Sequence, residues 1–193
     1  MKCDSPSVLF DHSGDCRIMC IVKRLVFSAV AVCLLVTSTL LWGGERRPFP
    51  NIELHSLDGQ TSVKMEDLRG HPVLLTFWAS WCGPCRAELP ELVTLSRELK
   101  TSGLVLLAIN VDSSAEAGLR FLRRGGIDVT AYRMSDQDQA MIGVRSLPTT
   151  ILLDGDALPV QIFTGYSPGV VEAIRGLVQG MARLDSTSEQ GSP

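Results

Sequence analysis

The feature that most restricts the fold of this chain is a short apolar run leading directly into two closely spaced cysteines. The run is VLLTFW at residues 73–78, and its apolar, β-rich composition predicts a buried strand. The sequence continues as ASWCGPC, after which leucines recur at helical spacing to near Gly103. Pro84 suits the first turn of a helix. The pattern therefore predicts that Cys82 and Cys85 lie at the amino terminus of a helix that follows a buried strand.

The segments around this motif alternate between strand and helix patterns. Asp58-Gly59 and Asp154-Gly155 each stand between two strand-like segments and predict β-hairpins. Pro90 is expected to kink the first helix. This alternation predicts an α/β fold with a central mixed sheet flanked by helices and an added N-terminal β-hairpin. The predicted strands are 52–57, 61–63, 104–111, 127–134, 149–153 and 160–163, and the further helices are 115–124, 136–142 and 168–182.

Residues 25–42 form an uncharged run of eighteen residues that directly follows Lys23-Arg24. As a helix this run would be about 27 Å long, close to the hydrocarbon thickness of a bilayer. The basic flank predicts a signal anchor with its amino terminus in the cytoplasm and the rest of the chain exported. Val36 and Ser38 would suit a weak cleavage site, so a cleaved, soluble periplasmic form stays an alternative.

The chain divides into five segments on this interpretation. Residues 1–24 are a cytoplasmic N-terminal segment, with Met19 as an alternative start, and residues 25–42 are the anchor. Residues 43–49 are a linker, residues 50–183 are one folded domain, and residues 184–193 are a disordered tail.

Composition excludes several classes of protein. The 18 basic and 21 acidic residues give a net charge of -3, which argues against a nucleic-acid-binding protein. Of six cysteines only Cys82 and Cys85 lie in the exported domain, and a loop this short stabilises little as a structural disulfide. A zinc site would need four ligands, and only His55 and His71 stand nearby in sequence. A redox pair remains, with no metal and no cofactor beyond a Cys82–Cys85 disulfide.

The two cysteines have different expected roles. A thiol attacks a disulfide only as the thiolate, and unpaired N–H groups at a helix amino terminus stabilise that form of Cys82. Cys85, one turn further in, is expected to be more buried and to resolve the mixed disulfide. Gly83 and Pro84 form the intervening turn, with Pro84 keeping the second sulfur within reach, and both are expected to contact the client. Arg86 is interpreted either as a helper of the thiolate or as an ordinary solvated arginine.

The segment FWASWCGPCRAELP resembles the active-site segment of thioredoxin-like proteins, in particular the membrane-anchored TlpA/ResA group of extracytoplasmic thiol-disulfide oxidoreductases. The resemblance covers about residues 50–182 and implies a thioredoxin-like fold. It rests on further matching positions at Val111-Asp112, Phe121, Val144, Leu147-Pro148-Thr149-Thr150 and Asp154-Gly155.

The resemblance also implies roles for individual residues. Pro148 should be cis and face the cysteines, with a client peptide pairing to the backbone at Leu147; a trans proline in an ordinary loop is the alternative. Thr76 stands where cytoplasmic thioredoxins have a buried aspartate, and it cannot act as a carboxylate base. Glu88 matches a glutamate implicated in proton handling, so we expect it to accept a proton from Cys85. The alternative is an exposed glutamate favoured by the helix dipole.

The two tryptophans and the arginines beyond the motif carry weaker expectations. Trp81, beside Cys82, is expected either to shape the client-facing surface or to pack structurally. Trp78, on the strand, is expected to pack in the core. Arg120, Arg123 and Arg124 are interpreted as a solvated helix face.

The expected function is protein thiol-disulfide exchange, and Gly83-Pro84 between the cysteines favours a reductant of low potential. Expected clients are proteins with disulfides, such as apocytochromes c or copper-site proteins, and a membrane thiol carrier would supply electrons. The alternatives are a disulfide-donating oxidase and a Cu(I) metallochaperone that uses both thiolates. Peroxide reduction fits less well, because a peroxidatic cysteine needs no neighbour at this spacing.

Overall fold

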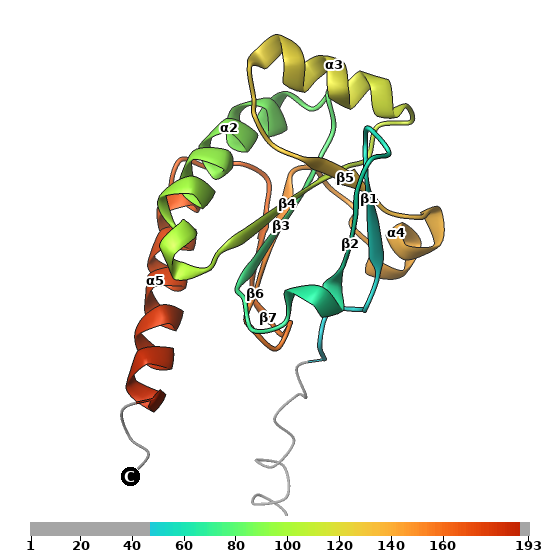
Figure 1. The fold of residues 1–193 in the computed structure, drawn as a ribbon. Helices are drawn as coiled ribbons and strands as arrows, with labels where there is room; N and C mark the ends of the chain where they lie inside the picture. Colours follow the sequence, from blue (N-terminus) through green and yellow to red (C-terminus); the bar gives the residue numbers. More distant parts are fainter. Residues whose placement is uncertain (1–46, 190–193) are drawn as a thin grey trace, which may run out of the picture. The chain divides into compact units, whose positions relative to one another are not determined.

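Residues 47–189 are described by a computed structural model, in which seven strands form one mixed sheet in the order β2-β1-β5-β4-β3-β6-β7 (Figure 1). The strands are β1 (Glu53–Ser56), β2 (Ser62–Lys64), β3 (Val73–Trp78), β4 (Val105–Asn110), β5 (Ala131–Arg133), β6 (Thr149–Leu153) and β7 (Pro159–Thr164). The helices are α2 (Gly83–Glu98), α3 (Ala115–Gly125), α4 (Asp136–Ile142) and α5 (Val170–Glu189), with 3-10 turns η1 (Met65–Leu68) and η2 (Lys100–Ser102).

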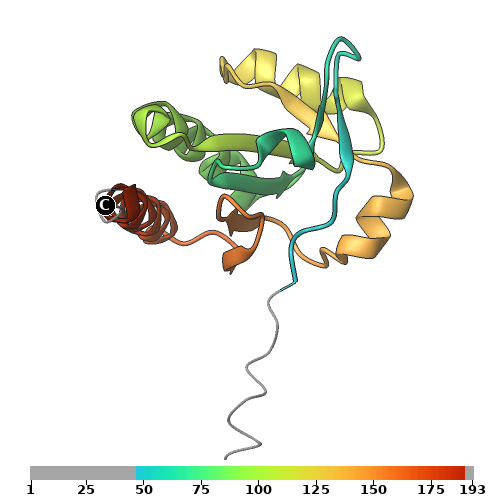
Figure 2. The ribbon, with the colours of Figure 1, turned by 60° about the horizontal axis from the view of Figure 1, so that its bottom comes forward.

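The predicted α/β architecture with a central mixed sheet is confirmed. Strand β3 pairs in parallel with β4 and antiparallel with β6, and β4 pairs in parallel with β5. The predicted hairpins are the antiparallel pairs β1–β2 and β6–β7. Helix α2 runs through Pro90 as one element, and a left-handed Gly103 with φ 73° follows η2. Figure 2 shows β3 in the interior of the sheet, so the cysteine motif begins at the carboxyl end of a central strand.

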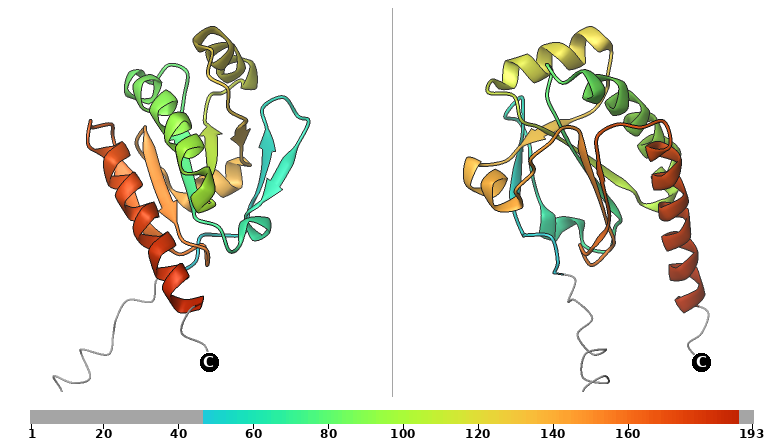
Figure 3. Two further views of the ribbon diagram at one scale, coloured as in Figure 1. Left: turned by 60° about the vertical axis from the view of Figure 1, so that its left-hand side comes forward. Right: turned by 180° about the vertical axis from the view of Figure 1, so that it is seen from behind.

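Helices cover both faces of the sheet, which explains why all six residues of β3 are buried. On one face Leu74 packs with leucines of α2 and with Ile174 and Val178 of α5. Helices α2 and α5 lie side by side on this face (Figure 3). On the other face Leu75 packs in a second cluster that Ile142 of α4 adjoins. Because successive side chains of a strand point to opposite faces, an apolar run without alternation is what a strand covered on both sides requires.

The carboxyl-terminal helix is longer than predicted. Helix α5 continues to Glu189, so the prediction of disorder from residue 184 is wrong for residues 184–189. Residues 181–189, MARLDSTSE, contain neither glycine nor proline, and a helix already formed by packing propagates through such a segment at little cost. Residues 190–193 lie outside the described residues.

The predicted anchor at residues 25–42 also lies outside the described residues, as do residues 1–24 and most of the linker. Within residues 47–189, no helix has the length and apolar character needed to cross a bilayer. The anchor therefore stays a prediction from sequence.

Helix α3 approaches β4 closely through a glycine. A Cβ added at Gly118 would lie 2.9 Å from Leu57 Cδ1 and 3.0 Å from the Asn110 side-chain amide. Asn110 is buried at the end of β4 and hydrogen-bonds the next acidic residue along the chain. The absence of a side chain at Gly118 thus allows α3 to lie over the strand end that borders the cysteine motif.

We expect Gly118→Ala to lower the free energy of unfolding by about 1–3 kcal/mol, because the added methyl group overlaps its neighbours. Gly176→Ala in α5 is the matched control, since nothing lies within 4 Å of a Cβ there. Removing a helical glycine from open surroundings should raise the free energy of unfolding by about 0.5–1 kcal/mol. Urea denaturation of the oxidised chain measures both. Equal effects of the two changes would contradict the close approach of α3.

Candidate active site

Two cysteines occupy the first turn of α2. Cys82 is the N-cap residue, with an extended backbone (φ -80°, ψ 106°), and its Sγ accepts a hydrogen bond from the Cys85 N–H at 3.2 Å. A disulfide joins the two cysteines, whose Cα atoms are 5.3 Å apart. Cys82 is 5% exposed and Cys85 is 1% exposed. The predicted place of the pair, at a helix amino terminus directly after a buried strand, is confirmed.

The segment between β3 and α2 is held by a buried carboxylate. Asp112 accepts hydrogen bonds from the Ser80 N–H at 3.0 Å and from the Ser80 hydroxyl at 3.1 Å. The Asn110 side-chain amide donates to the same carboxylate at 2.8 Å. Asp112 thereby orients the loop that presents Cys82.

Sequence reasoning named Asp112 only as part of a family resemblance and did not assign it this role. A signal was present, because Asp112 follows β4 and parallel neighbouring strands end at the same edge of a sheet. Polar residues that follow two adjacent parallel strands are therefore expected to meet, as Ser80 and Asp112 do.

A second buried polar group lies behind the cysteines. Glu88 is 1% exposed, and its Oε1 lies 3.4 Å from the Thr150 hydroxyl, which in turn lies 3.0 Å from the Thr76 hydroxyl. Glu88 Oε2 has no hydrogen-bond partner among the described residues. The alternative of an exposed glutamate is wrong, because the helix face shared with Cys85 is turned toward the sheet.

The environment of Glu88 raises the pKa of its carboxyl from 4.5 to about 7. Burial is the largest cause, since it disfavours the charged form, and the negative charge of Glu91 adds to it. The hydrogen bond with Thr150 acts in the opposite direction. A carboxyl with a pKa near neutral can both accept and return a proton at neutral pH, which suits the role expected from sequence.

A groove lies beside the first cysteine. The Leu147–Pro148 peptide bond is cis, as predicted. The groove has a volume of about 490 Å³, and Cys82 lines it together with all four residues that the sequence analysis assigned to client binding: Trp81, Gly83, Pro84 and Leu147. Trp81 is 71% exposed.

The backbone at Leu147 is available for pairing with a peptide. Within residues 47–189, neither the N–H nor the C=O of Leu147 has a hydrogen-bond partner. The neighbouring Pro148 carbonyl accepts from the Gly165 N–H at 2.8 Å, and Thr149 begins β6. An extended peptide laid along Leu147 would therefore find a free donor and acceptor next to Cys82.

The second tryptophan has a structural place. Trp78 is 1% exposed, and its ring packs against Phe121 of α3 with a centroid separation of 5.5 Å. The predicted core packing of Trp78 is confirmed.

On the other side of the motif, the Arg86 guanidinium lies over the Phe121 ring at 5.7 Å from its centroid. Arg86 is exposed, as the alternative of a solvated arginine expects, and its charge faces an aromatic ring.

The described residues hold no group of three or more His, Cys, Asp or Glu side chains arranged to bind a metal ion. A soft ion such as Cu(I) could bind the thiolates of Cys82 and Cys85 only after their disulfide is reduced.

Comparison with known proteins gives one family model, described as the AhpC/TSA family, which matches residues 46–176. Among curated relatives, the chain is 31% identical to thiol-disulfide oxidoreductase ResA of Bacillus subtilis over 119 residues, which is 60% of this chain and 65% of that protein. It is 35% identical to ResA of Geobacillus kaustophilus over 118 residues, 60% of this chain and 67% of that protein. The chain thus spans about two thirds of the length of the relatives that it matches.

Solved structures share the fold. A protein described as thiol:disulfide interchange protein DsbE from Chlorobium tepidum superposes with a TM-score of 0.64 at 29% identity, covering 70% of this chain and 95% of that chain. A DsbF homologue from Corynebacterium diphtheriae superposes with a TM-score of 0.61 at 28% identity, covering 72% and 88%. The predicted thioredoxin-like fold is confirmed.

The raised pKa of Glu88 predicts a loss of stability as the pH rises. Below about pH 4.5 the carboxyl is protonated in both the folded and the unfolded chain. Between about pH 4.5 and 7 the unfolded chain releases the proton and the folded chain retains it, so folding becomes less favourable by about 3 kcal/mol in all. Glu88→Gln should remove this loss.

The measurement is urea denaturation of the oxidised wild-type and Glu88→Gln chains at several pH values from 4.5 to 8. Glu53→Gln, at an exposed position of β1, is the control for losing one negative charge. Stability curves that stay parallel for wild type and Glu88→Gln would show that the Glu88 carboxyl titrates as an ordinary glutamate.

Proposed function

The chain belongs to the AhpC/TSA family, and we propose that it is a thiol-disulfide oxidoreductase that reduces disulfide bonds in client proteins. The observation that carries the proposal is the Cys82–Cys85 pair at the amino terminus of α2. Beside the pair lies a groove with an unpaired backbone at Leu147. The names of the curated relatives and of the solved neighbours are those of disulfide-exchange proteins, which supports the same activity.

The reaction begins with the reduced chain. The Cys82 thiolate attacks one sulfur of a client disulfide; the client S–S bond breaks, an S–S bond to Cys82 forms, and the second client sulfur leaves as a thiolate that takes up a proton. The N–H groups of the first turn of α2 stabilise the attacking anion. Groove residues hold the client backbone in line with Cys82. The attacking and attacked sulfurs are then already positioned for reaction, as they would not be in a random encounter.

Cys85 completes the exchange. Its thiol loses a proton and attacks the Cys82 sulfur, the mixed disulfide breaks, and the first client sulfur leaves as a thiolate. The client gains two electrons and two protons, and the chain is left with the Cys82–Cys85 disulfide. Cys85 is 1% exposed, so bulk water is a poor acceptor for its proton. We assign that step to Glu88, which shares its helix face and has a pKa of about 7.

The direction of the exchange is assigned as reduction. Gly83-Pro84 between the cysteines is the thioredoxin dipeptide, and thioredoxin has a potential of about -270 mV. The clients that suit such a reductant are apocytochromes c before haem attachment and copper-site proteins whose cysteines must be thiols. Electrons would come from a membrane thiol carrier, and the anchor at residues 25–42 would hold the domain outside the cytoplasm beside it.

The reduction potential tests the direction. Equilibration of the 193-residue chain with thiol redox buffers, read by mass after alkylation, should give a value nearer about -270 mV than the roughly -120 mV of the oxidant DsbA. The reduced chain should also cleave insulin disulfides. Cys82→Ser and Cys85→Ser, which each retain one sulfur, are the controls and should not turn over. A potential near that of DsbA would make the chain a disulfide donor and contradict the proposal.

A further inference from the structure

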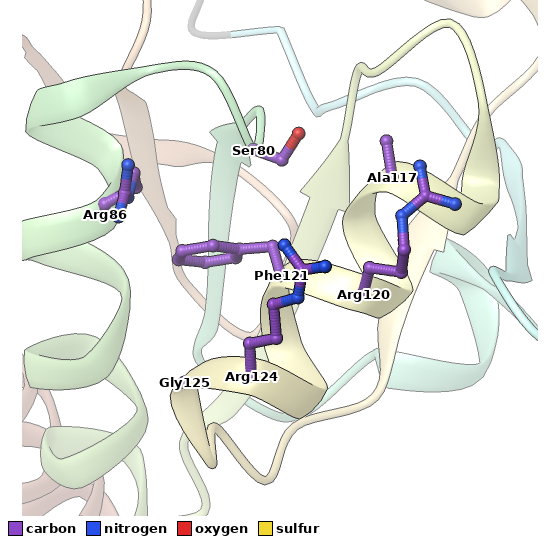
Figure 4. Close-up of a pocket in the computed structure, with 7 residues that line it drawn as sticks. All are labelled: Ser80, Arg86, Ala117, Arg120, Phe121, Arg124 and Gly125. Atoms are coloured by element: carbon purple, nitrogen blue, oxygen red, sulfur yellow. The ribbon is translucent and has the colours of Figure 1, made fainter.

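A pocket separate from the client groove lies between α2 and α3 (Figure 4). It has a volume of about 390 Å³ and is lined by Arg86 of α2, by Arg120, Phe121 and Arg124 of α3, and by Ser80 of the loop before Cys82. The Phe121 side chain lies between Arg86 on one side and Arg120 and Arg124 on the other. The pocket and the groove at Leu147 share no lining residue.

The charge of this arginine pocket is unbalanced. Three guanidinium groups line it, and no acidic residue does. Arg120 makes an ion pair at 3.4 Å with Glu116, one turn earlier in α3. Among the described residues, Arg86 and Arg124 have no carboxylate partner. Because the whole chain has a net charge of -3, this is a local concentration of positive charge on an acidic protein.

One of the guanidinium groups lies over an aromatic ring. Trp78 packs against Phe121 from the core, and Arg86 lies over the Phe121 ring at 5.7 Å. A guanidinium within about 6 Å of a ring face is attracted to the ring, and its N–H groups remain free to donate two hydrogen bonds to one carboxylate. This attraction favours positions of the Arg86 side chain near the ring, so less side-chain freedom is lost when an anion binds there.

The pocket lies next to the reacting sulfur along the chain. Ser80 precedes Cys82 by two residues, so their Cα atoms are at most about 7 Å apart. Arg86 follows Cys82 by one helical turn. When Cys82 attacks a client disulfide, the client residues next to that disulfide in sequence are therefore within reach of this pocket.

We propose that the arginine pocket binds a carboxylate of the client polypeptide, so that this chain prefers disulfides with acidic residues close by in sequence. The inference rests on the proposed function and specifies its substrate class. It also separates the α3 arginines that the sequence analysis treated together. Arg120 and Arg124 line the pocket, whereas Arg123 is exposed and does not line it.

The test uses the full 193-residue chain and synthetic peptides that each contain one disulfide. In two peptides a pair of glutamates stands a few residues before or after the disulfide, and in matched peptides glutamines replace them. With the chain reduced beforehand and at low ionic strength, we expect the second-order rate constant for peptide reduction to be about three- to tenfold higher for one glutamate peptide than for its glutamine match. The ratio should fall toward one as salt is added, because these charges are exposed to solvent.

Three variants assign the preference to the pocket. Arg120→Gln combined with Arg124→Gln should bring the glutamate-to-glutamine ratio close to one, and the same two positions changed to glutamate should reverse it. Arg123→Gln removes one charge from the same helix outside the pocket and should leave the ratio as in wild type. Each readout is a ratio of two reduction rates, so it tests the inference only in a chain that reduces peptides. A chain that reduces no peptide would contradict the proposed function and not this inference.

Three results would overturn the inference. Equal rates for the glutamate and glutamine peptides would show that the pocket holds no client carboxylate. A ratio that falls as far in Arg123→Gln as in the double variant would show a general effect of helix charge. Binding to anionic phospholipid vesicles that depends on Arg120 and Arg124, without any peptide preference, would assign the pocket to lipid and not to clients.

Discussion

The place of β3 between β4 and β6 sets the geometry of everything around the cysteines. Its antiparallel register with β6 puts Thr76 opposite Thr150, and both hydroxyls face the side of the sheet that α2 covers. Its parallel register with β4 brings the ends of both strands to one edge, where Asp112 accepts hydrogen bonds from Ser80. Helix α2 starts directly after this edge, with Cys82 as its N-cap. A shift of one residue in either register would turn the polar pairs to the wrong face of the sheet.

The two buried carboxyl groups near the cysteines differ in the number of hydrogen-bond donors that reach them. Asp112 receives three donors from two residues and acts as a fixed acceptor that holds a loop. Glu88 has one long contact, from Thr150, and an oxygen without a partner among the described residues, so burial dominates and its proton is held to about pH 7. A buried carboxyl that few donors reach holds its proton to higher pH, and such groups are candidates for proton transfer. The same burial that lowers the free energy of unfolding at neutral pH thus gives Glu88 the pKa that suits proton transfer from Cys85.

Much of this arrangement could be predicted from sequence because local patterns encode it. The apolar run before the cysteines requires a strand covered on both faces, and Asp-Gly pairs mark both hairpins. Burial of Glu88 could not be derived locally, since a glutamate in the first turns of a helix suits solvent equally well. The extension of α5 to Glu189 was missed because polar composition suggests disorder while the absence of helix breakers permits a helix. The arginine pocket depends on how α2 and α3 approach each other, and helical periodicity within α3 alone does not contain that information.

The central claim is that Cys82 attacks and Cys85 resolves, and single-sulfur variants test it most directly. The reduced Cys85→Ser and Cys82→Ser chains, which retain the other sulfur in the same fold, are mixed with an excess of a disulfide-containing client, and mixed disulfides are mapped by mass after acid quenching. The account predicts rapid accumulation of a stable mixed disulfide through Cys82 in Cys85→Ser, and little or none through Cys85 in Cys82→Ser. Equal trapping by the two variants, or faster trapping through Cys85, would contradict it.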